Sequence, residues 1–202
     1  MLCIDNTGTL ACSQMTRPYE LKKRAERMAE TERRIVDAAV KLHTSVGPGR
    51  TSVAAVAERA GVQRHTVYAH FPDRPSLFKA CSAHWRAQHP FPDMDGLAGI
   101  AEPSQRLRAA LDALYAWYGR VEHDLALFTR DAEAVPPDVR DADARLYRGL
   151  RDLVGEGWPR RRAVRAAIGH ALVFETWRSL CRRERLSRRA AVDAMVRLVS
   201  SV

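Results

Sequence analysis

Apolar residues recur along this chain three or four positions apart, which is the spacing of one face of an α-helix. No segment of useful length alternates apolar and polar residues with the period of two that a half-buried strand requires. Prolines and glycines interrupt the helical pattern at intervals, and the sequence contains no internal repeat. The pattern predicts an all-α protein of about nine helices, with three or four in a small amino-terminal domain and five in a larger carboxy-terminal one.

Residues 51–71 carry the most informative pattern, because they predict two short helices joined by a tight turn. Thr51 or Ser52 can cap the first helix through a hydroxyl group. Gly61 follows the first helix directly and suits a left-handed exit. The first apolar face consists of Val53, Val56, Ala57 and Ala60, and a second, shorter one consists of Val62, Val67 and Phe71. This arrangement predicts a helix-turn-helix whose second helix carries many polar side chains.

Flanking signals set the limits of the amino-terminal domain. A helix over about residues 30–46 precedes the helix-turn-helix and ends at a Gly-Pro-Gly sequence. Pro72 ends the second short helix, and Asp73 is placed to cap a fourth helix. Pro90 and Pro92 then mark a break. We therefore expect a helix-turn-helix domain at residues 28–89 and a second domain at residues 90–202.

Five helices are predicted in the second domain. The predicted segments are one capped by Ser104 with Val121 as its last inward position, one over residues 123–134, one opened by Asp138 with Leu146 inward, one running from Pro159 to about Arg183, and one opened by Ser187.

The first residues of the chain show no helical pattern. Residues 1–16 have no periodicity and are expected to be disordered, whereas residues 17–30 are strongly basic and compatible with a helix. Residues 1–27 are thus predicted to form a disordered or basic amino-terminal arm, which either lies along phosphates or is a solvated tail. Met1, Met15 and Met28 are alternative start positions, and the sequence does not choose between them.

Composition changes the picture only in part. The 202 residues have a formal net charge of +9, which suits a polyanionic partner such as nucleic acid. An arginine-rich genome is the alternative explanation, because lysine supplies only four of the 33 basic residues. The four cysteines form no Cys-x-x-Cys pair, so we expect no zinc and no cofactor. With no signal peptide and no apolar run long enough for a membrane helix, the expected location is cytoplasmic.

Sequence motifs of enzymes are lacking. The chain contains no glycine-rich phosphate loop, no Gly-x-Ser-x-Gly and no His-Glu-x-x-His, so it is not expected to be an enzyme. The acidic residues Asp138, Asp141 and Asp143 alternate with arginines, which is typical of a solvated helix face.

Residues 30–82 resemble the DNA-binding domain of the tetracycline-repressor (TetR/AcrR) family of bacterial regulators. The shared motifs are Arg34-Ile35-Val36-Asp37-Ala38-Ala39, Thr51-Ser52-Val53, Val56-Ala57-Glu58-Arg59-Ala60-Gly61-Val62, Thr66-Val67-Tyr68-Ala69-His70-Phe71-Pro72 and Leu77-Phe78. The resemblance covers about a quarter of the chain. Two residues depart from the family pattern: Gln63 stands where a capping serine is common, and His65 stands where many members have glycine or proline. Without that serine, the start of the second short helix is expected to be weakly capped.

The resemblance implies that the second short helix enters the major groove of DNA. Arg64 would then reach a guanine edge or hold a phosphate, and His65 would donate to a base edge or make no contact. Tyr68 matches a phosphate-holding position, although packing between helices is the alternative. The full set of expected DNA-binding residues is Thr51, Ser52, Gln63, Arg64, His65, Thr66, Tyr68, His70 and Arg74.

Aromatic residues of the second domain are candidates for a ligand pocket, with aromatic core or a dimer interface as the alternatives. The candidates are Trp117, Tyr118, Phe128, Tyr147, His170, Phe174 and Trp177. His170, Phe174 and Trp177 are spaced i, i+4, i+7 and would share one helix face. Glu175 and Thr176 could hydrogen-bond a ligand.

The expected function is that of a one-component transcriptional regulator, a repressor released from a palindromic operator by a small molecule. The resemblance further implies a homodimer held by a four-helix interface from residues 160–183 and 187–201. Ala167, Gly169 and Ala171 would allow close approach, and Leu172, Val192, Met195 and Val199 would fill the seam. The helix that starts after Asp73 would be the only direct link between the two domains. The alternative function is a ligand-independent helical DNA-binding or adaptor protein.

Overall fold

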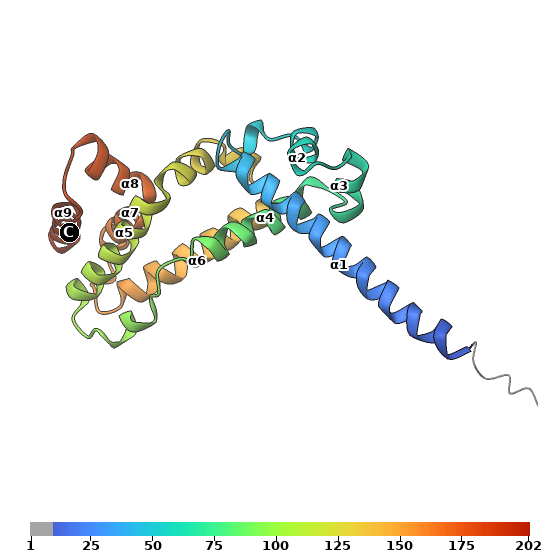
Figure 1. The fold of residues 1–202 in the computed structure, drawn as a ribbon. Helices are drawn as coiled ribbons and strands as arrows, with labels where there is room; N and C mark the ends of the chain where they lie inside the picture. The colour runs from blue at the N-terminus through green and yellow to red at the C-terminus, as the bar shows by residue number, and fades with distance from the viewer. Residues whose placement is uncertain (1–9) are drawn as a thin grey trace, which may run out of the picture.

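The computed structural model describes the backbone of residues 10–202 and the side chains of residues 19–202 (Figure 1). Within this part of the chain there are nine α-helices and no β-strand, which confirms the all-α prediction. The helices are α1 (Leu10–His43), α2 (Val53–Ala60), α3 (Arg64–His70), α4 (Arg74–Gln88), α5 (Pro103–Arg130), α6 (Pro137–Gly155), α7 (Arg162–Leu172), α8 (Phe174–Arg178) and α9 (Arg188–Ser200).

Helix α1 is much longer than the sequence predicts. It begins at Leu10 rather than near residue 30, and it ends at His43 rather than Val46. Residues 10–16 are therefore helical, not disordered as expected; residues 1–9 lie outside the described part of the chain. Between residues 19 and 30 the stretch has no glycine or proline and consists mostly of good helix formers, which favours the extension. Ile35 and Ala39, both fully buried, anchor its carboxy-terminal half in the first domain.

Helices α2 and α3 form the predicted helix-turn-helix. The Ser52 hydroxyl accepts a hydrogen bond from the Ala55 amide at 3.1 Å and caps α2. Gly61 ends α2 in the left-handed conformation, with a φ of 65°. Ala57 and Val67 are buried as expected, at 3% and 1% exposure. The small side chain of Ala57, the turn at Gly61 and the buried Val67 thus hold the two helices in a fixed orientation.

Helix α4 starts at the predicted place. The Asp73 carboxylate accepts from the Ser76 amide at 2.7 Å, and the Ser76 hydroxyl donates to the Asp73 carbonyl at 2.8 Å. Leu77, Cys81 and Trp85 are buried on its inner face, as the apolar pattern indicates. This helix packs along α1 and continues toward the second domain (Figure 1).

The second domain is built around α5, whose buried residues include Leu107, Leu111 and Leu114. The sequence predicts two helices in this region, one from Ser104 to Val121 and one over residues 123–134. The structure has a single helix, α5, which is kinked at Val121, where φ is −112° and ψ is 16°. Its cap is the Glu102 carboxylate, which accepts from the amides of residues 104 and 105, so the prediction of Ser104 as the cap was wrong.

The helix predicted over residues 159–183 is broken. Helix α7 begins only at Arg162, and Val173 is extended, with φ −85° and ψ 150°. A π-helical turn at Ser179–Arg183 follows α8. The carbonyls that a continuous helix would use are taken by side chains: Tyr115 donates to Ala171 O at 2.8 Å and Tyr118 donates to Leu172 O at 2.6 Å.

Residues predicted for the dimer seam lie inside a single chain. Helix α9 packs against α5 and α7 of its own chain. Leu172, Val192, Met195 and Val199 are all buried there, at 8% exposure or less, and Ala171 is fully buried. These side chains form the core of the second domain, so their assignment to an interface between copies was wrong.

Candidate nucleic-acid interface and ligand cavity

Helix α3 presents a polar face away from the first domain. Gln63, Arg64, His65 and Tyr68 are exposed, while Thr66 is half-buried and Val67 holds the helix from behind. The side chain of Gln63 makes no capping hydrogen bond, as its residue type predicts. Tyr68 is 44% exposed, which disfavours the alternative of packing between helices. These exposed polar side chains of α3 are therefore accessible to the major groove of DNA.

The expected contacts around α3 differ in how accessible they are. Thr51 is buried, and its hydroxyl donates to the Gly47 carbonyl at 2.9 Å, so its side chain belongs to the turn rather than to the DNA-facing surface. Ser52 and Arg74 are exposed. The His70 ring is 10% exposed and lies 3.8 Å from the Glu32 carboxylate on α1, which leaves little of it for a phosphate.

Arg34 of α1 is a structural residue that sequence reasoning quoted but did not explain. Its guanidinium donates to the Ala60 carbonyl and, at 3.3 Å, to the Gly61 carbonyl. These carbonyls sit at the end of α2, where helix termini leave acceptors without intrahelical partners. Arg34 therefore fixes the turn that orients α3.

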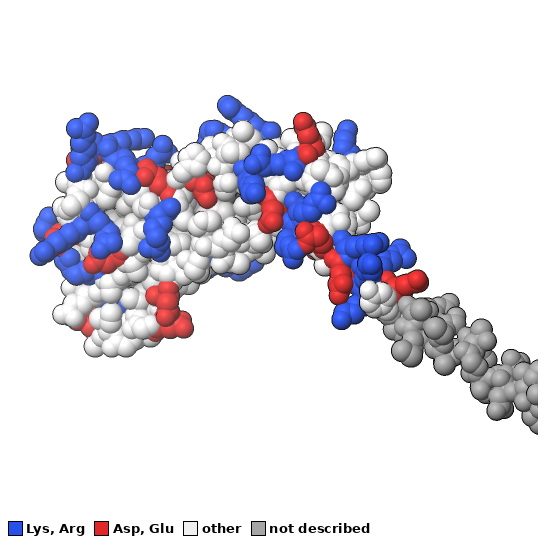
Figure 2. All heavy atoms as spheres, in the orientation of Figure 1, with Lys and Arg blue, Asp and Glu red and all other residues white. Residues whose placement is uncertain are grey.

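Positive charge is spread over two regions of the surface. Figure 2 shows Lys and Arg side chains along α1 and over the far end of the second domain, with a mostly uncharged stretch between them. The acidic partners at the far end include Glu122, Asp152 and Asp193, which pair with arginines. The excess of basic residues is therefore not confined to α3.

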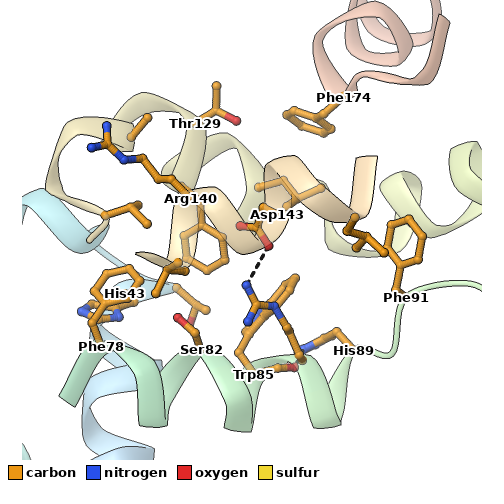
Figure 3. A pocket seen from close by; sticks show the side chains of 18 of the residues that line it. His43, Phe78, Ser82, Trp85, His89, Phe91, Thr129, Arg140, Asp143 and Phe174 are labelled. Atoms are coloured by element: carbon orange, nitrogen blue, oxygen red, sulfur yellow. Dashed lines mark hydrogen bonds and ion pairs between the residues drawn. The ribbon is translucent and has the colours of Figure 1, made fainter. Parts of the chain in front are cut away.

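A cavity of about 490 Å³ lies between the two domains. Helices α1 and α4 form one wall, and α5, α6 and the start of α8 form the other (Figure 3). The apolar and aromatic lining consists of Val40, Phe78, Trp85, Phe91, Trp117, Leu125, Phe128, Val135, Val139, Leu146, Tyr147, Val173 and Phe174. A volume of this size, with mostly apolar walls, is typical of a small-molecule site.

Four predicted pocket residues line this cavity: Trp117, Phe128, Tyr147 and Phe174. Glu175 also reaches it. Leu146, predicted to point into the core, is instead 46% exposed and stands at the cavity edge.

The other three candidates do not line the cavity. Tyr118 is fully buried, and its hydroxyl lies 2.9 Å from the Tyr147 hydroxyl, so burial raises its pKa. Trp177 is buried against Phe174, with ring centroids 5.5 Å apart. His170 is exposed. The break at Val173 separates His170 from the other two, so the predicted shared face does not exist.

Sequence reasoning missed the cavity wall supplied by the first domain. Trp85 of α4 donates its indole N–H to Asp124 Oδ2 of α5 at 2.7 Å and stacks on His89 with centroids 4.8 Å apart. The pattern of α4 predicts an inward position for Trp85, near the second domain, but not a place in a cavity wall. At the cavity edge, Arg86 of α4 pairs with Asp143 of α6 at 2.7 Å (Figure 3). The helix that follows α3 therefore forms a wall of the cavity.

His43 and Cys81 meet on this wall. The Cys81 Sγ lies 3.3 Å from His43 Nδ1. Burial, aided by the charge of Arg74, lowers the pKa of His43 to about 4. Burial also raises the pKa of the Cys81 thiol to about 12. Both groups are neutral at pH 7, so this part of the cavity wall suits an uncharged part of a ligand. The thiol is not activated as a nucleophile.

A second connection joins the domains beside the cavity. The Asp131 carboxylate, after α5, accepts from the Gly49 amide at 2.9 Å, and Arg130 donates to the Val46 carbonyl at 2.7 Å. Hydrogen bonds from Arg130 and Gly49 lower the pKa of Asp131 to about 2. His123 Nε2 lies 2.9 Å from the Thr44 carbonyl. The prediction that α4 is the only direct link was therefore wrong.

Two searches of the described residues gave no candidates. No group of three His, Cys, Asp or Glu side chains in this part of the chain is placed to hold a metal ion. None of the described helices is both long and apolar enough to cross a membrane.

The chain thus joins a helix-turn-helix with an exposed polar second helix to a helical domain that helps to enclose an apolar cavity. Residues 35–81 match the family model described as "Bacterial regulatory proteins, tetR family". This match covers the helix-turn-helix domain, which is less than half of the chain. No curated protein sequence matches the chain.

Solved structures share the fold across both domains. A TetR-like transcriptional regulator from Rhodococcus sp. RHA1 is 21% identical, with a TM-score of 0.56 over 84% of this chain and 93% of that one. A tetR family regulator from Shewanella sp. PV-4 is 20% identical, with a TM-score of 0.57 over 84% and 95%. The regulator FadR from Bacillus subtilis, solved with stearoyl-CoA, is 20% identical, with a TM-score of 0.53 over 84% and 98%.

Proposed function

We propose that the protein is a one-component transcriptional repressor that binds operator DNA through α3 and releases it when a small molecule occupies the cavity. The single observation that carries this proposal is the position of α4. This helix follows α3 directly, and its residues Phe78, Trp85 and Arg86 also line the cavity. A molecule that moves this wall must displace α4, and α4 is joined directly to the recognition helix α3. We propose no catalytic role. Because its proposed partner is chromosomal DNA, we expect the protein to act in the cytoplasm.

DNA reading is assigned to the exposed face of α3. Arg64 has a planar guanidinium that can donate to guanine O6 and N7 together, and Thr66 offers a methyl group to thymine. Tyr68 and Arg74 are placed for phosphates on either side. Because the operator is unknown, the first experiment is selection of bound duplexes from random DNA by the purified protein, followed by sequencing.

Two substitutions then separate base reading from phosphate binding. Arg64→Ala should weaken binding to the selected duplex by ~1–3 kcal/mol and relax the preference at one base pair in each half-site. Tyr68→Phe should weaken binding to all sequences alike, because a phosphate contact carries no sequence information. A uniform, sequence-independent loss for both variants would assign Arg64 to phosphate and remove it from the reading set.

A homodimer is the expected binding form. One short recognition helix reads too few base pairs for an operator, and two-fold pairing places two such helices about one DNA turn (~34 Å) or a multiple apart. With the predicted seam residues buried in the core, we place the interface on the outer faces of α7 and α9. Leu198, which is 42% exposed on α9, is its apolar centre.

The interface is tested by charge substitution, because deleting α9 would expose the core of the domain. Leu198→Glu should give a monomer by analytical ultracentrifugation, and the exposed residue Arg145 on α6 provides the matched control as Arg145→Glu. A Leu198→Glu variant that stays dimeric and binds the selected duplex would contradict this placement.

The ligand class follows from the cavity walls. Apolar rings line most of the space, and a few polar groups stand at the edge, so an uncharged or singly charged molecule with an apolar ring or chain fits best. The stearoyl-CoA of FadR is a ligand of that protein; here it supports only the idea that this fold holds an apolar effector. Thermal-shift screening of such compounds identifies binders, since a ligand of the native state raises the midpoint.

Ligand-independent DNA binding is the second candidate function. The abundance of arginine favours it, because charge alone supplies non-specific affinity. Binding to random DNA as tightly as to the selected sequence would favour it. A selected duplex bound at least about 10³-fold more tightly than random DNA at physiological salt would count against a non-specific DNA binder.

A further inference from the structure

The amino-terminal half of α1 extends from the first domain as a free-standing helix (Figure 1). The side chains of residues 19–30 are exposed without exception. At a rise of 1.5 Å per residue, the helical segment from residue 10 to residue 30 reaches about 30 Å beyond the domain. We call residues 19–30 the arm.

Nothing in the described chain packs against the arm. Among residues 19–202, the hydrogen bonds and ion pairs of side chains at the arm stay within α1: the Thr31 hydroxyl donates to the Arg27 carbonyl at 2.9 Å, and Arg33 pairs with Glu30. An isolated helix of this length is marginally stable in water, and most helices in proteins are stabilised by what they pack on. We therefore expect a binding partner to stabilise the arm.

Charge on the arm indicates what the partner is. Lys22, Lys23, Arg24 and Arg27 fall within six residues, against the acidic residues Glu20, Glu26 and Glu30. Lys23, Arg27 and Arg34 are spaced i, i+4 and i+11, which places them on one face of α1. Arg34 on this face contacts the carbonyls at the turn before α3. This face thus carries three cations from the helix-turn-helix out along the arm, with Glu30 as the one acidic residue between Arg27 and Arg34.

We propose that the arm binds the phosphates of DNA that flank the base pairs read by α3. This inference rests on the proposed function, because the arm continues the interface that α3 begins. Backbone phosphates attract Lys and Arg side chains whatever the base sequence, and each cation engaged releases counterions. The arm lengthens the footprint and adds affinity without adding specificity.

A second copy of the chain is a poorer occupant. The arm exposes Tyr19, Leu21 and Met28, of which Leu21 and Met28 are seven residues apart and Tyr19 lies on another face. A coiled coil needs two apolar positions in every heptad, and here the second is only the small Ala25, with Glu32 at the next one. Pairing two arms would also bring the cations at residues 22–27 together, which costs energy in the absence of a polyanion.

The test uses the full chain with the four cations Lys22, Lys23, Arg24 and Arg27 replaced by glutamine, a good helix former. The matched control removes four exposed cations from the second domain: Arg145, Arg148, Arg160 and Arg183. Binding to a random-sequence 40-base-pair duplex and to the selected duplex is measured across a range of salt concentrations. Circular dichroism verifies the helix content, and sedimentation verifies the oligomeric state.

Loss of two or more phosphate contacts should lower the slope of log K against log salt by about 2 or more, and affinity near 0.15 M salt by about 10-fold or more. Both duplexes should be affected alike, and the control variant should bind as the wild type does. An arm variant with the slope and affinity of the control would overturn the proposal. A variant that keeps its DNA affinity but dissociates into monomers would overturn it too, in favour of contact between copies. Failure of the proposed function looks different, since wild-type protein would then show no preference for any selected duplex.

Discussion

Replacing Trp85 with phenylalanine removes one hydrogen bond between α4 and α5 and keeps an aromatic ring in place. The indole N–H donates to Asp124 Oδ2 at 2.7 Å, and the side chain is only 7% exposed. A hydrogen bond to a charged group contributes ~1.5–3 kcal/mol. Because Asp124 is half-buried and water can partly replace the donor, we expect a loss of about 2 kcal/mol in the free energy of unfolding.

Urea denaturation followed by circular dichroism measures this loss, and thermal unfolding provides a second estimate. For a chain of about 200 residues, 2 kcal/mol corresponds to a fall of roughly 4–8 °C in the midpoint. The matched control is Trp158→Phe, because the Trp158 indole N–H finds no hydrogen-bond partner among the described residues. That variant should lose much less, since it removes ring area but no hydrogen bond.

A double-mutant cycle with Asp124→Leu isolates the pair. If the bond contributes as stated, the second substitution should cost about 2 kcal/mol less in the Trp85→Phe background than in the wild type. Strictly additive losses, or equal losses for the two tryptophan variants, would refute the assignment of Trp85 as a polar connection between α4 and α5.

Three further substitutions or conditions test other parts of the structure. Gly61→Ala should destabilise the protein by ~1–2 kcal/mol in urea, because φ is 65° there, while Gly96→Ala, with nothing near its added Cβ, should be neutral or slightly stabilising. His43 has a folded pKa of about 4, below its unfolded value of 6.5, so stability should fall by about 2–3 kcal/mol as the pH drops from 7 to 4.5, and a His43→Gln variant should lack this loss. Asp131→Ala should speed hydrogen exchange at the Gly49 amide, and in the wild-type protein the same protection should persist until the pH approaches 2; unchanged exchange in that variant would show that the contact is not formed in solution.

The helix-turn-helix and the start of α4 could be predicted closely because their signals are local. Ser52, Gly61 and Asp73 each fix a helix end through their own side chain or backbone, so the sequence shows where α2 and α4 begin and where α2 ends. The polar face of α3 follows in the same way from the spacing of its buried anchor, Val67.

The break between α7 and α8 could not be predicted, because its cause is not local. Tyr115 and Tyr118 of α5 donate to the carbonyls of Ala171 and Leu172, more than 50 residues away along the chain. The sequence around Val173 has no proline or glycine to mark the break, and its apolar spacing continues through it.

The cavity was predicted only in part for a related reason. An apolar stripe on a helix looks the same in the sequence whether it faces a packed core or a cavity. Trp85 was therefore expected to face inward near the second domain but not to line a cavity, and Tyr118 and Trp177 were assigned to a pocket although both are buried in the core. The partners of each side chain decide between these roles, and they come from distant parts of the chain.

The most direct test of the coupling between the cavity and the DNA-binding helix α3 is a reciprocal titration. The dissociation constant of the selected duplex is measured with and without a saturating compound from the thermal-shift screen. The affinity of the compound is then measured with and without the duplex. The account predicts that each weakens the other by the same factor, between about 5-fold and 150-fold, as linkage requires. A compound that binds the cavity and leaves the affinity for DNA unchanged would contradict the account.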